Sequence, residues 1–538
     1  MSGVGKGITT ASIGTILQSK GYKVSLMKAD PYLNVDAGTM NPTEHGEVFV
    51  LDSGLETDQD MGNYERFLGI SLPTENYMTN GMIFKHVIDK ERALGYHGKC
   101  VEPVYHITEE ILRRIKSSIA KNNSEITVFE IGGTVGEYQN AIFLEAARML
   151  KLKYPKDVIF VMVSYLPVPG KLGEMKTKPT QNAVRQLNSY GINADMIVAR
   201  SEVPLDHKRK EKIALATGVP VENVISAPDI KSIYEVPINF EKDNLGERVL
   251  GIFGLRSRKK DLVEWKKAVL RMKAPKNELK VAVVGKYFDT GDFMLSDAYV
   301  SVIEAVKFSA FKLGAEAKLT WINSKEFETG KLKIEMLSDF DGVIVPGRFG
   351  SSGIEGVIKT IKHAREKKIP YLGLCYGMQL AVIEYARNVV GLKGANTREI
   401  DPNSKHLVID IMHEQKKNLE QGNFGGSMRL GSYLALLKKN SIARAVYGKE
   451  LIRERHRHRY EVNPEYITKL EKTGLVFSGR SPNGRLMEIV ELPKTKHPFF
   501  LGTQFHPEFK ARPLSPHPLF NAFITAALKK RAQKTKKT

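Results

Sequence analysis

A lone cysteine stands in a sequence setting that suits a nucleophile. In "IPYLGLCYGMQLAVIEYA", an apolar run of strand length passes through Gly373-Leu374-Cys375-Tyr376-Gly377 into a helical pattern. This spacing is the cysteine form of the nucleophile elbow, whose glycines permit the tight turn that exposes the reactive side chain. A helix N-terminus also stabilises a thiolate. The pattern predicts a nucleophilic Cys375, and a buried structural cysteine is the competing interpretation.

A histidine and a glutamate near the C-terminus could complete this centre. The stretch "TQFHPEF" contains His506, which could accept the thiol proton, and Glu508, two residues further on. On an extended segment Glu508 would lie on the same side as His506 and could orient its imidazole. His506 alone would also suit a satisfied core histidine. The elbow and the His-Pro-Glu pattern together predict a cysteine–histidine–glutamate centre.

A glycine-rich stretch at the start of the chain could bind phosphate. In "SGVGKGITTAS", small residues and Lys6 precede a helical pattern, so backbone N–H groups, the helix dipole and one ammonium could converge on an oxyanion. The usual spacing G-x-x-x-x-G-K-[ST] is not met, because Gly7 follows Lys6. We interpret the stretch as a deviant phosphate loop; a glycine-rich helix start with a solvated lysine is the alternative.

Several charged side chains could serve such a phosphate site. Glu130 ends the apolar run "EITVFEI", where a carboxylate could hold Mg²⁺ against phosphates. The turn-rich stretch "GLETDQDMGNYERF" supplies three more carboxylates: Glu56, Asp58 and Asp60. Lys176 and Lys178 precede a further helical pattern and could bind a second polyphosphate. Helix caps and solvated loop charges are the alternative interpretation for each of these residues.

The elements that must position these residues alternate between strand and helix. Apolar runs such as "KVSLMKAD", "DVIFVMVSY" and "ADMIVARS" are separated by helical patterns such as "HITEEILRRIKSSIAK". After a basic stretch, "LKVAVVGKY" begins a second series with "FDGVIVPG", "LMEIVEL" and "FFLGTQF". The fold class is therefore α/β, with two doubly wound domains and mainly parallel sheets. We expect domains at 1–254 and 279–528, a linker helix at 255–278 and a disordered basic tail at 529–538.

Composition narrows the class of protein. The 538 residues include two cysteines, Cys100 and Cys375, which excludes a disulfide scaffold and is typical of a reducing cytoplasm. We expect neither a transmembrane span nor a signal peptide. The formal net charge is +21, but the basic clusters are scattered and no nucleic-acid-reading motif is present. Small anionic substrates therefore explain the charge better than nucleic acid does.

Longer motifs indicate a family. "GLCYGMQ", "VPGRFG" and "QFHPEF" resemble the class I (triad) glutamine amidotransferases, and further motifs, most of them in the N-terminal half, are similar to those of CTP synthases. The motifs that carry this second resemblance are "SGVGKGI", "DPYLNVDAGTMNPTEHGEVFV", "ETDQDMGNYERF", "EIGGTVGE", "KTKPTQ" and "RHRHRYEVNP". The resemblance covers essentially the whole chain. It implies a P-loop NTPase-like synthetase (amidoligase) domain followed by a flavodoxin-like glutaminase domain.

The resemblance implies a reaction and assigns the catalytic residues. ATP would phosphorylate the 4-oxygen of UTP, and ammonia released from L-glutamine would displace the phosphate to give CTP. Cys375, His506 and Glu508 would hydrolyse the glutamine. The positions that match glutamine-binding residues are Arg348, Tyr376, Gly377, Met378, Gln379, Glu399 and Arg459. Backbone N–H groups at Arg348 and Tyr376 would form the oxyanion hole.

The same matching assigns the nucleotide side. The positions implied to bind nucleotide are Ser2, Gly3, Val4, Gly5, Lys6, Gly7, Ile8, Lys28, Asp60, Glu137, Tyr138, Gln139, Lys176, Thr177, Lys178, Pro179, Thr180, Gln181, Lys212 and Asp229. Within this set, Glu137–Gln139, Lys176–Gln181 and Lys212 would serve UTP or inhibitory CTP, and Asp229 would lie on the ATP side. Asp60 and Glu130 would bind Mg²⁺. His45 would line the ammonia route.

Regulators, assembly and location also follow from the resemblance. It implies activation by GTP, feedback inhibition by CTP, a homotetramer and a cytoplasmic enzyme. Ser352 stands where the family has an arginine linked to GTP activation. Glu102 and Glu137–Gln139 depart from the family pattern on the pyrimidine side.

The resemblance also leads to a prediction about the start of the chain. The family carries a strand and a short glycine turn before the phosphate loop, so we predict that the natural protein is longer at its N-terminus than Met1. An intact mass that matches Met1 would contradict this.

One alternative function is another ATPase–glutaminase fusion, such as an enzyme that amidates cobyrinic acids. A basic nucleic-acid-binding or filament-forming protein without activity is the other.

Overall fold

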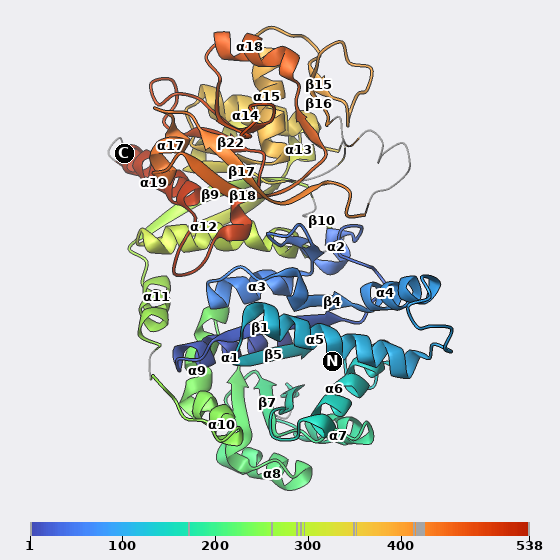
Figure 1. Cartoon of the computed structure of the whole chain (residues 1–538). Coiled ribbons are helices and arrows are strands. Elements are labelled where there is room, and N and C mark those ends of the chain that lie inside the picture. The colour runs from blue at the N-terminus through green and yellow to red at the C-terminus, as the bar shows by residue number, and fades with distance from the viewer. Residues whose placement is uncertain are drawn as a thin grey trace. The chain divides into compact units, whose positions relative to one another are not determined.

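The computed structural model (Figure 1) describes residues 3–170, 173–259, 262–286, 289–290, 293–294, 296–347, 350, 352–412, 415 and 425–535. Two of the predicted site residues, Ser2 and Arg348, lie outside the described residues. The chain divides into two compact units. The first comprises Met1–Asp36 and Asp60–Val269, and the second comprises Ala37–Gln59 and Leu270–Thr538.

Strands and helices alternate in the first unit, as the sequence predicts. The strands are β1 (Val24–Asp30), β4 (Tyr77–Thr79), β5 (Ile126–Ile131), β6 (Val161–Tyr165), β7 (Met196–Ser201) and β8 (Val224–Pro228). The helices are α1 (Lys6–Ser19), α3 (Gln59–Leu68), α4 (Asn80–Arg92), α5 (Thr108–Asn122), α6 (Ala141–Lys153), α7 (Lys178–Ser189), α8 (His207–Thr217), α9 (Val236–Phe240), α10 (Leu245–Ile252) and α11 (Val263–Lys273), whose last residues belong to the second unit.

Parallel pairing builds two small sheets in this unit. β1 pairs with β4 and β5, and β7 pairs with β6 and β8. Met27 and Ala29 of β1 join an apolar core with α4, α5 and α6. The intervening Leu26 faces α1, where a Cβ on Gly14 would lie 2.7 Å from its side chain. Because side chains alternate along a strand, α1 and α5 cover opposite faces of β1.

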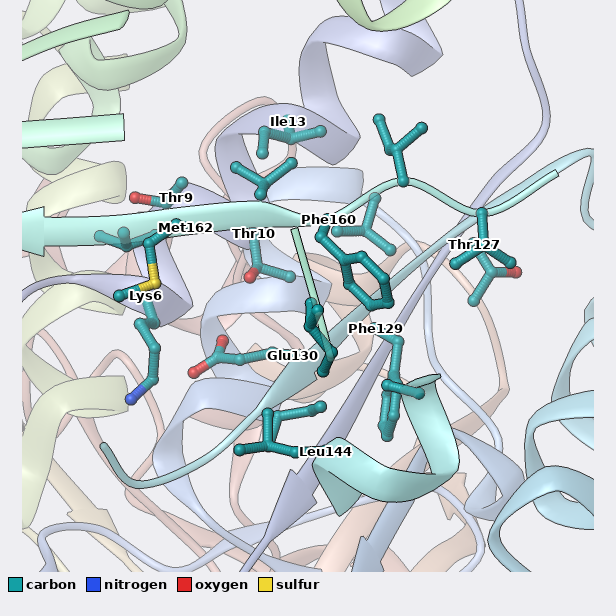
Figure 2. A pocket seen from close by; sticks show the side chains of 18 of the residues that line it. Lys6, Thr9, Thr10, Ile13, Thr127, Phe129, Glu130, Leu144, Phe160 and Met162 are labelled. Carbon is teal, nitrogen blue, oxygen red and sulfur yellow. The ribbon is translucent and has the colours of Figure 1, made fainter. Parts of the chain in front are cut away.

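A cavity of about 1300 Å³ separates the two sheets (Figure 2). Phe129 of β5 and Met162 of β6 line it, together with Ile13 of α1. Within the described part of the chain, β5 and β6 are edge strands of their sheets, and β5 is mostly half-buried whereas β1 is buried throughout. Two unpaired edges beside an apolar cavity are what an additional parallel strand requires. The prediction of a longer natural N-terminus stays a prediction.

The second unit is built on one large sheet, and its remaining strands form small ribbons. The large-sheet strands are β9 (Asn277–Gly285), β12 (Ala315–Asn323), β13 (Gly342–Val345), β14 (Tyr371–Leu374), β17 (Arg429–Leu437), β18 (Leu451–His458), β20 (Val476–Arg480), β21 (Met487–Glu491) and β22 (Phe500–Thr503). The others are β2 (Phe49–Val50), β3 (Glu56–Thr57), β10 (Asp289–Thr290), β11 (Phe293–Met294), β15 (Asn396–Thr397), β16 (Leu407–Ile411) and β19 (Tyr460–Val462). The helices are α2 (Pro42–His45), α12 (Val300–Lys312), α13 (Ser324–Glu328), α14 (Ile354–Glu366), α15 (Tyr376–Asn388), α17 (Ile442–Tyr447), α18 (Pro464–Lys472) and α19 (Pro518–Thr535).

The large sheet runs in the order β12-β9-β13-β14-β22-β21-β20-β17-β18. Its strands from β12 to β22 are parallel, and the rest pair antiparallel. Val343 and Val345 join the core formed with α14 and α15. Gly342 faces the other way, where a Cβ would lie 2.6 Å from the Phe523 ring of α19. Helices therefore cover both faces of the sheet, and the predicted α/β fold class is confirmed.

The structure differs from the expected domain organisation in one internal segment. We expected 1–254 to form one domain, but Ala37–Gln59 groups with the second unit. The buried Glu47 carboxylate accepts hydrogen bonds from the Ser301 amide at 3.1 Å, at the N-terminal end of α12. Local sequence pattern could not indicate this, because the partner lies 254 residues away.

The basic C-terminal stretch also differs from expectation. Residues 529–535 continue α19 instead of forming a disordered tail. Lys530 Nζ donates to the Phe340 carbonyl at 2.8 Å, and Lys534 Nζ donates to the Ser338 carbonyl at 2.8 Å. The basic side chains thus satisfy carbonyl groups of the second unit while the apolar face of α19 packs on the sheet. Among the described helices, none combines the length and apolar character needed to cross a membrane.

Filling the cavity between β5 and β6 should stabilise the first unit. We expect an N-terminal extension of about nine apolar, β-branched residues, joined to Val4 through a short glycine turn, to raise Tm by about 5 °C or more. The reason is that the extension would bury apolar surface and pair two open strand edges. Calorimetry would measure the shift against a glycine–serine extension of equal length. Equal Tm values for the two variants would contradict the prediction.

Candidate active site

Cys375 occupies the tight turn between β14 and α15. Its backbone φ of 49° and ψ of −99° lie where residues other than glycine are rare. A Cβ on Gly377 would lie 2.3 Å from the Val345 carbonyl oxygen, so this neighbour must be glycine. The Cys375 amide donates to the Thr503 carbonyl of β22 at 2.6 Å. The turn predicted from the glycine spacing is present, and it holds the thiol at the N-terminus of a thirteen-residue helix.

An imidazole and a carboxylate lie beside this thiol. His506 Nδ1 is 2.7 Å from Glu508 Oε1, and both side chains are buried. A Cβ on Gly347 would lie 2.8 Å from the His506 ring and 3.5 Å from Cys375 Cβ, so the two side chains border the same glycine. Glu508 lies in the 3-10 turn Pro507–Lys510 and not on the extended segment that we expected. The contact that we expected is nevertheless present.

The electrostatics of this group favour a charged imidazole. Burial opposes the imidazolium, but the charges of Glu508 and Cys375 outweigh burial and raise the pKa of His506 to about 10. Within the described part of the site, His506 Nε2 has no hydrogen-bond partner. A protonated His506 beside the thiol is the arrangement that stabilises a cysteine thiolate and can protonate a leaving amine.

Gln504 is a neighbour of Cys375 that sequence reasoning missed. Its Nε2 donates to Cys375 Sγ at 3.6 Å, and its Oε1 accepts from Gln379 Nε2 at 3.2 Å. Gln379, predicted to hold glutamine, also donates to the Tyr460 carbonyl at 3.0 Å and so fixes Gln504 against the sulfur. The period-two spacing of Gln504, His506 and Glu508 is the sequence signal that would have indicated it.

Two more of the residues predicted to bind the substrate glutamine, Glu399 and Arg459, carry opposite charges. Glu399 Oε1 accepts from the Gly350 amide at 2.8 Å, and Arg459 Nη1 donates to Ser427 Oγ at 3.0 Å. Burial lowers the pKa of Arg459, and Glu399 is among the carboxylates that oppose this shift. An amino acid brings one ammonium and one carboxylate, which a glutamate and an arginine can bind. Tyr376, Gly377 and Met378 form the first turn of α15.

The glycine loop of the first unit leads directly into α1. Gly3 and Gly5 adopt φ of 72° and 84°, a conformation that favours glycine, and Gly5 caps the helix. Lys6 Nζ donates to the Gly133 carbonyl beyond the end of β5. Burial lowers the pKa of Lys6, and Glu130 opposes this shift. The loop therefore places the N-terminal end of α1 and the Lys6 ammonium at the carboxyl end of β5, as an anion site requires.

Asp60 and Glu130 flank a second buried lysine. Lys28 Nζ contacts Asp60 Oδ2 and lies 3.0 Å from Glu130 Oε1. Burial alone would lower the pKa of Lys28, but Asp60 and Glu130 outweigh it and hold this pKa well above its ordinary value. Tyr64, which sequence reasoning missed, donates its hydroxyl to Glu130. A Cβ on Gly7 would lie 2.1 Å from Asp60 Oδ1, so the glycine loop and this carboxylate are in contact.

These two carboxylates suit a magnesium ion that also binds phosphate. Mg²⁺ is usually held through one or two protein carboxylates together with substrate oxygens and water. Asp60 and Glu130 converge on one point beside the glycine loop, where Lys28 now balances their charge. Within the described residues, no group of three or more His, Cys, Asp or Glu side chains could hold a metal by itself. The donor set therefore fits a metal carried with a nucleotide.

The loop after β5 carries the first group of predicted pyrimidine residues. Glu137 Oε2 accepts from the Thr134 amide at 3.1 Å and from Gln139 Nε2 at 3.2 Å. Tyr138 is 97% exposed. The loop borders α7, because a Cβ on Gly136 would lie 1.9 Å from Gln186 Nε2. The structure thus brings the Glu137–Gln139 loop beside the helix that begins at Lys178.

The second group lies at the N-terminal end of α7. Thr180 Oγ1 is 2.9 Å from Ser164 Oγ of β6, and Gln181 Nε2 donates to Thr177 Oγ1 at 3.1 Å. Lys178 and Pro179 occupy exposed positions of the first turn.

The remaining residues predicted to bind nucleotide are Lys176, Lys212 and Asp229. Lys176 pairs with Glu174 at 2.6 Å, and Lys212 of α8 also acts electrostatically on Glu174, whose pKa is lowered mainly by the Lys176 hydrogen bond. On the other flank of the loop, Asp229 pairs with Arg200 at 2.8 Å. Arg200 reaches within 4.0 Å of a Cβ placed on Gly5. The predicted nucleotide positions therefore lie on both flanks of the glycine loop.

Comparisons with known proteins agree with this geometry. The family model described as "CTP synthase N-terminus" matches residues 1–255, and the model described as "Glutamine amidotransferase class-I" matches residues 294–526. A CTP synthase of Pyrococcus abyssi is 49% identical over 536 residues, which are 99% of this chain and 97% of that relative. A CTP synthase of Sulfolobus acidocaldarius is 47% identical over 527 residues, or 98% of each chain.

One solved structure is also similar over the second half of the chain. The glutaminase domain of Trypanosoma brucei CTPS with bound acivicin is 35% identical, covers 47% of this chain and 94% of its own, and has a TM-score of 0.42. The curated relatives confirm the sequence-based expectation of a glutamine-hydrolysing ligase over the cobyrinic acid alternative. Because it is 47% and 49% identical to these two relatives over nearly its whole length, the chain belongs to the CTP synthase family.

Proposed function

We propose that the chain aminates UTP to CTP with ATP, using ammonia that Cys375 releases from L-glutamine. The 49% identity over 99% of the chain carries this conclusion, and the buried Cys375, His506 and Glu508 support it. The second unit would release the nitrogen, and the first unit would activate the uracil ring. The glycine loop with Lys6, Lys28, Asp60 and Glu130 supports the second part of this division.

The glutaminase half-reaction needs a thiolate and a proton donor. The Cys375 thiolate attacks the carboxamide carbon, and the oxyanion that forms is stabilised by backbone N–H groups at the start of α15. His506 gives its proton to the departing nitrogen, so the C–N bond breaks and ammonia and a thioester result. Water then attacks the thioester while His506 accepts its proton, releasing glutamate and the thiolate. Glu508 keeps the imidazole in position through both steps.

The synthetase half-reaction needs charge neutralisation around a triphosphate. The 4-oxygen of UTP attacks the terminal phosphorus of ATP, and ADP leaves. Ammonia then attacks C4 and inorganic phosphate departs with the oxygen. Backbone N–H groups of Gly3–Ile8 and the Lys6 ammonium would balance the phosphate charge. Mg²⁺ held by Asp60 and Glu130 would supply further positive charge at the phosphates.

The remaining nucleotide residues have proposed places in this scheme. Glu137–Gln139, Lys176–Gln181 and Lys212 would bind the pyrimidine nucleotide, either UTP or the inhibitor CTP. Asp229 would lie on the ATP side. We further propose activation by GTP, a homotetramer, an ammonia route past His45 and a cytoplasmic location. The presence of only two cysteines supports the last of these.

Removing the nucleophile should separate the two half-reactions. We expect Cys375→Ala to lower glutamine-dependent CTP formation by roughly 10³-fold or more, because no covalent intermediate can form. CTP formation from added ammonia should stay within about twofold of wild type. Product chromatography with UTP, ATP and each nitrogen source measures both rates. Loss of the ammonia reaction would show that Cys375 serves the synthetase as well.

The charge on His506 should set part of the pH dependence of folding stability. The pKa of His506 is raised from 6.5 to about 10, so its protonation stabilises the folded state fully below pH 6.5, and this stabilisation is lost as the pH rises through about 10. The free energy of unfolding should therefore fall between pH 7 and pH 9, by up to about 1.4 kcal/mol per pH unit from this group. Denaturant unfolding at several pH values in this range measures the change.

Glu508→Gln is the companion variant for this measurement. It removes the carboxylate that raises the pKa of His506, so the fall in the free energy of unfolding between pH 7 and pH 9 should be shallower than in wild type. An equal fall in the variant would contradict the assigned role of Glu508.

Unlike Cys375→Ala, Asp60→Asn should slow CTP formation from both nitrogen sources. We expect this change to lower CTP formation from both glutamine and ammonia by about 10²-fold or more, because one carboxylate for Mg²⁺ and the neighbour of Lys28 is removed. Lys85→Met, which breaks an exposed pair with Asp89, is the control and should leave both rates within about twofold. Full activity of Asp60→Asn at low Mg²⁺ would exclude Asp60 as a ligand.

A further inference from the structure

The segment Ala37–Gln59 packs against the strand that supports the catalytic cysteine and histidine. Within the second unit, Asp52 Oδ1 accepts from Arg455 Nε at 2.7 Å, and Glu56 Oε1 accepts from Arg457 Nε at 2.7 Å. Arg455 Nη1 also donates to the Val50 carbonyl at 3.0 Å. Both arginines belong to β18, and Arg455 is fully buried.

The backbone of the same two arginines contacts the catalytic residues. The His506 amide donates to the Arg455 carbonyl at 2.8 Å, and Cys375 Sγ lies 3.7 Å from the Arg457 carbonyl oxygen. Each arginine therefore joins one carboxylate of the segment to one residue of the glutaminase centre. A shift of either guanidinium would displace the carbonyl on which the catalytic residue rests.

Aromatic packing gives a further, independent contact. The ring of Phe49 meets Phe509 edge to face at 5.1 Å, and Phe509 stacks on the His506 imidazole at 5.1 Å. Phe49 is fully buried. The imidazole is thus supported by the segment through Phe509 as well as through Arg455.

We propose that Asp52 and Glu56 are positioning residues of the glutaminase centre, acting through Arg455 and Arg457 on His506 and Cys375. Both carboxylates lie far from the thiol in sequence and act only by fixing the backbone of β18. Glu56 is fully buried and the Arg457 side chain is 13% exposed, so a neutral side chain at position 56 removes a charged partner where little solvent can replace it. The centre would then lose its alignment without losing any reacting group.

This positioning role rests on the proposed function, because the alignment of Cys375 and His506 affects a measurable rate only if they hydrolyse glutamine.

The test is Glu56→Gln in the full-length protein. We expect kcat for glutamine hydrolysis to fall about 30-fold with KM changed less than about threefold, because misplacement of a reacting group lowers turnover more than binding. The rate of inactivation by 6-diazo-5-oxo-L-norleucine, which alkylates the nucleophile, should fall in parallel. CTP formation from ammonia should remain within about twofold of wild type, which also shows that the variant folds. Glu56→Asp should recover most of the loss.

Controls separate positioning from general damage. Glu471→Gln breaks a more exposed pair with Arg480, 2.9 Å long, and should leave hydrolysis unchanged. In a double-mutant cycle, Arg457→Gln added to Glu56→Gln should cost little more than either single change.

Two negative outcomes are distinguishable. Wild-type protein that hydrolyses no glutamine would overturn the proposed function itself. Wild-type hydrolysis with an equal kcat in Glu56→Gln would overturn the positioning role alone.

Discussion

The glutaminase centre depends on keeping a positive charge in a buried place. His506 is almost entirely enclosed, so burial alone would leave its imidazole neutral, and only the nearby Glu508 carboxylate and Cys375 thiol reverse this. The charge of His506 therefore depends on both of these neighbours. This explains why the backbone accepts an unfavourable conformation at Cys375 and why glycine stands at 347 and 377, where a Cβ would collide with the His506 ring or the Val345 carbonyl.

The first unit also holds charged groups largely away from water, but there two carboxylates surround one lysine. Glu130 is a buried carboxylate and Asp60 a half-buried one, and Lys28 between them compensates their charge. Burial raises the pKa of Glu130 and opposes the effect of Lys28, whereas the pKa of Asp60 is lowered because Lys28 outweighs burial there. Both units thus keep the charged groups of their sites largely away from water.

Local sequence predicted the parts of these sites that local geometry determines. The glycine spacing around Cys375 and the closeness of His506 and Glu508 follow from a few neighbouring residues. Long-range contacts could not be predicted in this way. The Ala37–Gln59 segment continues the first unit in sequence, yet its partners Arg455 and Arg457 lie about 400 residues away. The basic C-terminus resembled a solvated tail because composition does not reveal the carbonyl groups that Lys530 and Lys534 bind.

The ionisation of His506 is the property that tests this account most directly. Histidine-selective ¹⁵N labelling, with His506→Gln to assign its signals among the 13 histidines, would report the protonation of both ring nitrogens across a pH titration. The account predicts an imidazolium at pH 8 that loses its proton near pH 10. A neutral imidazole at pH 8, with an apparent pKa at or below 6.5, would show that the buried centre does not hold the charge on which the mechanism rests.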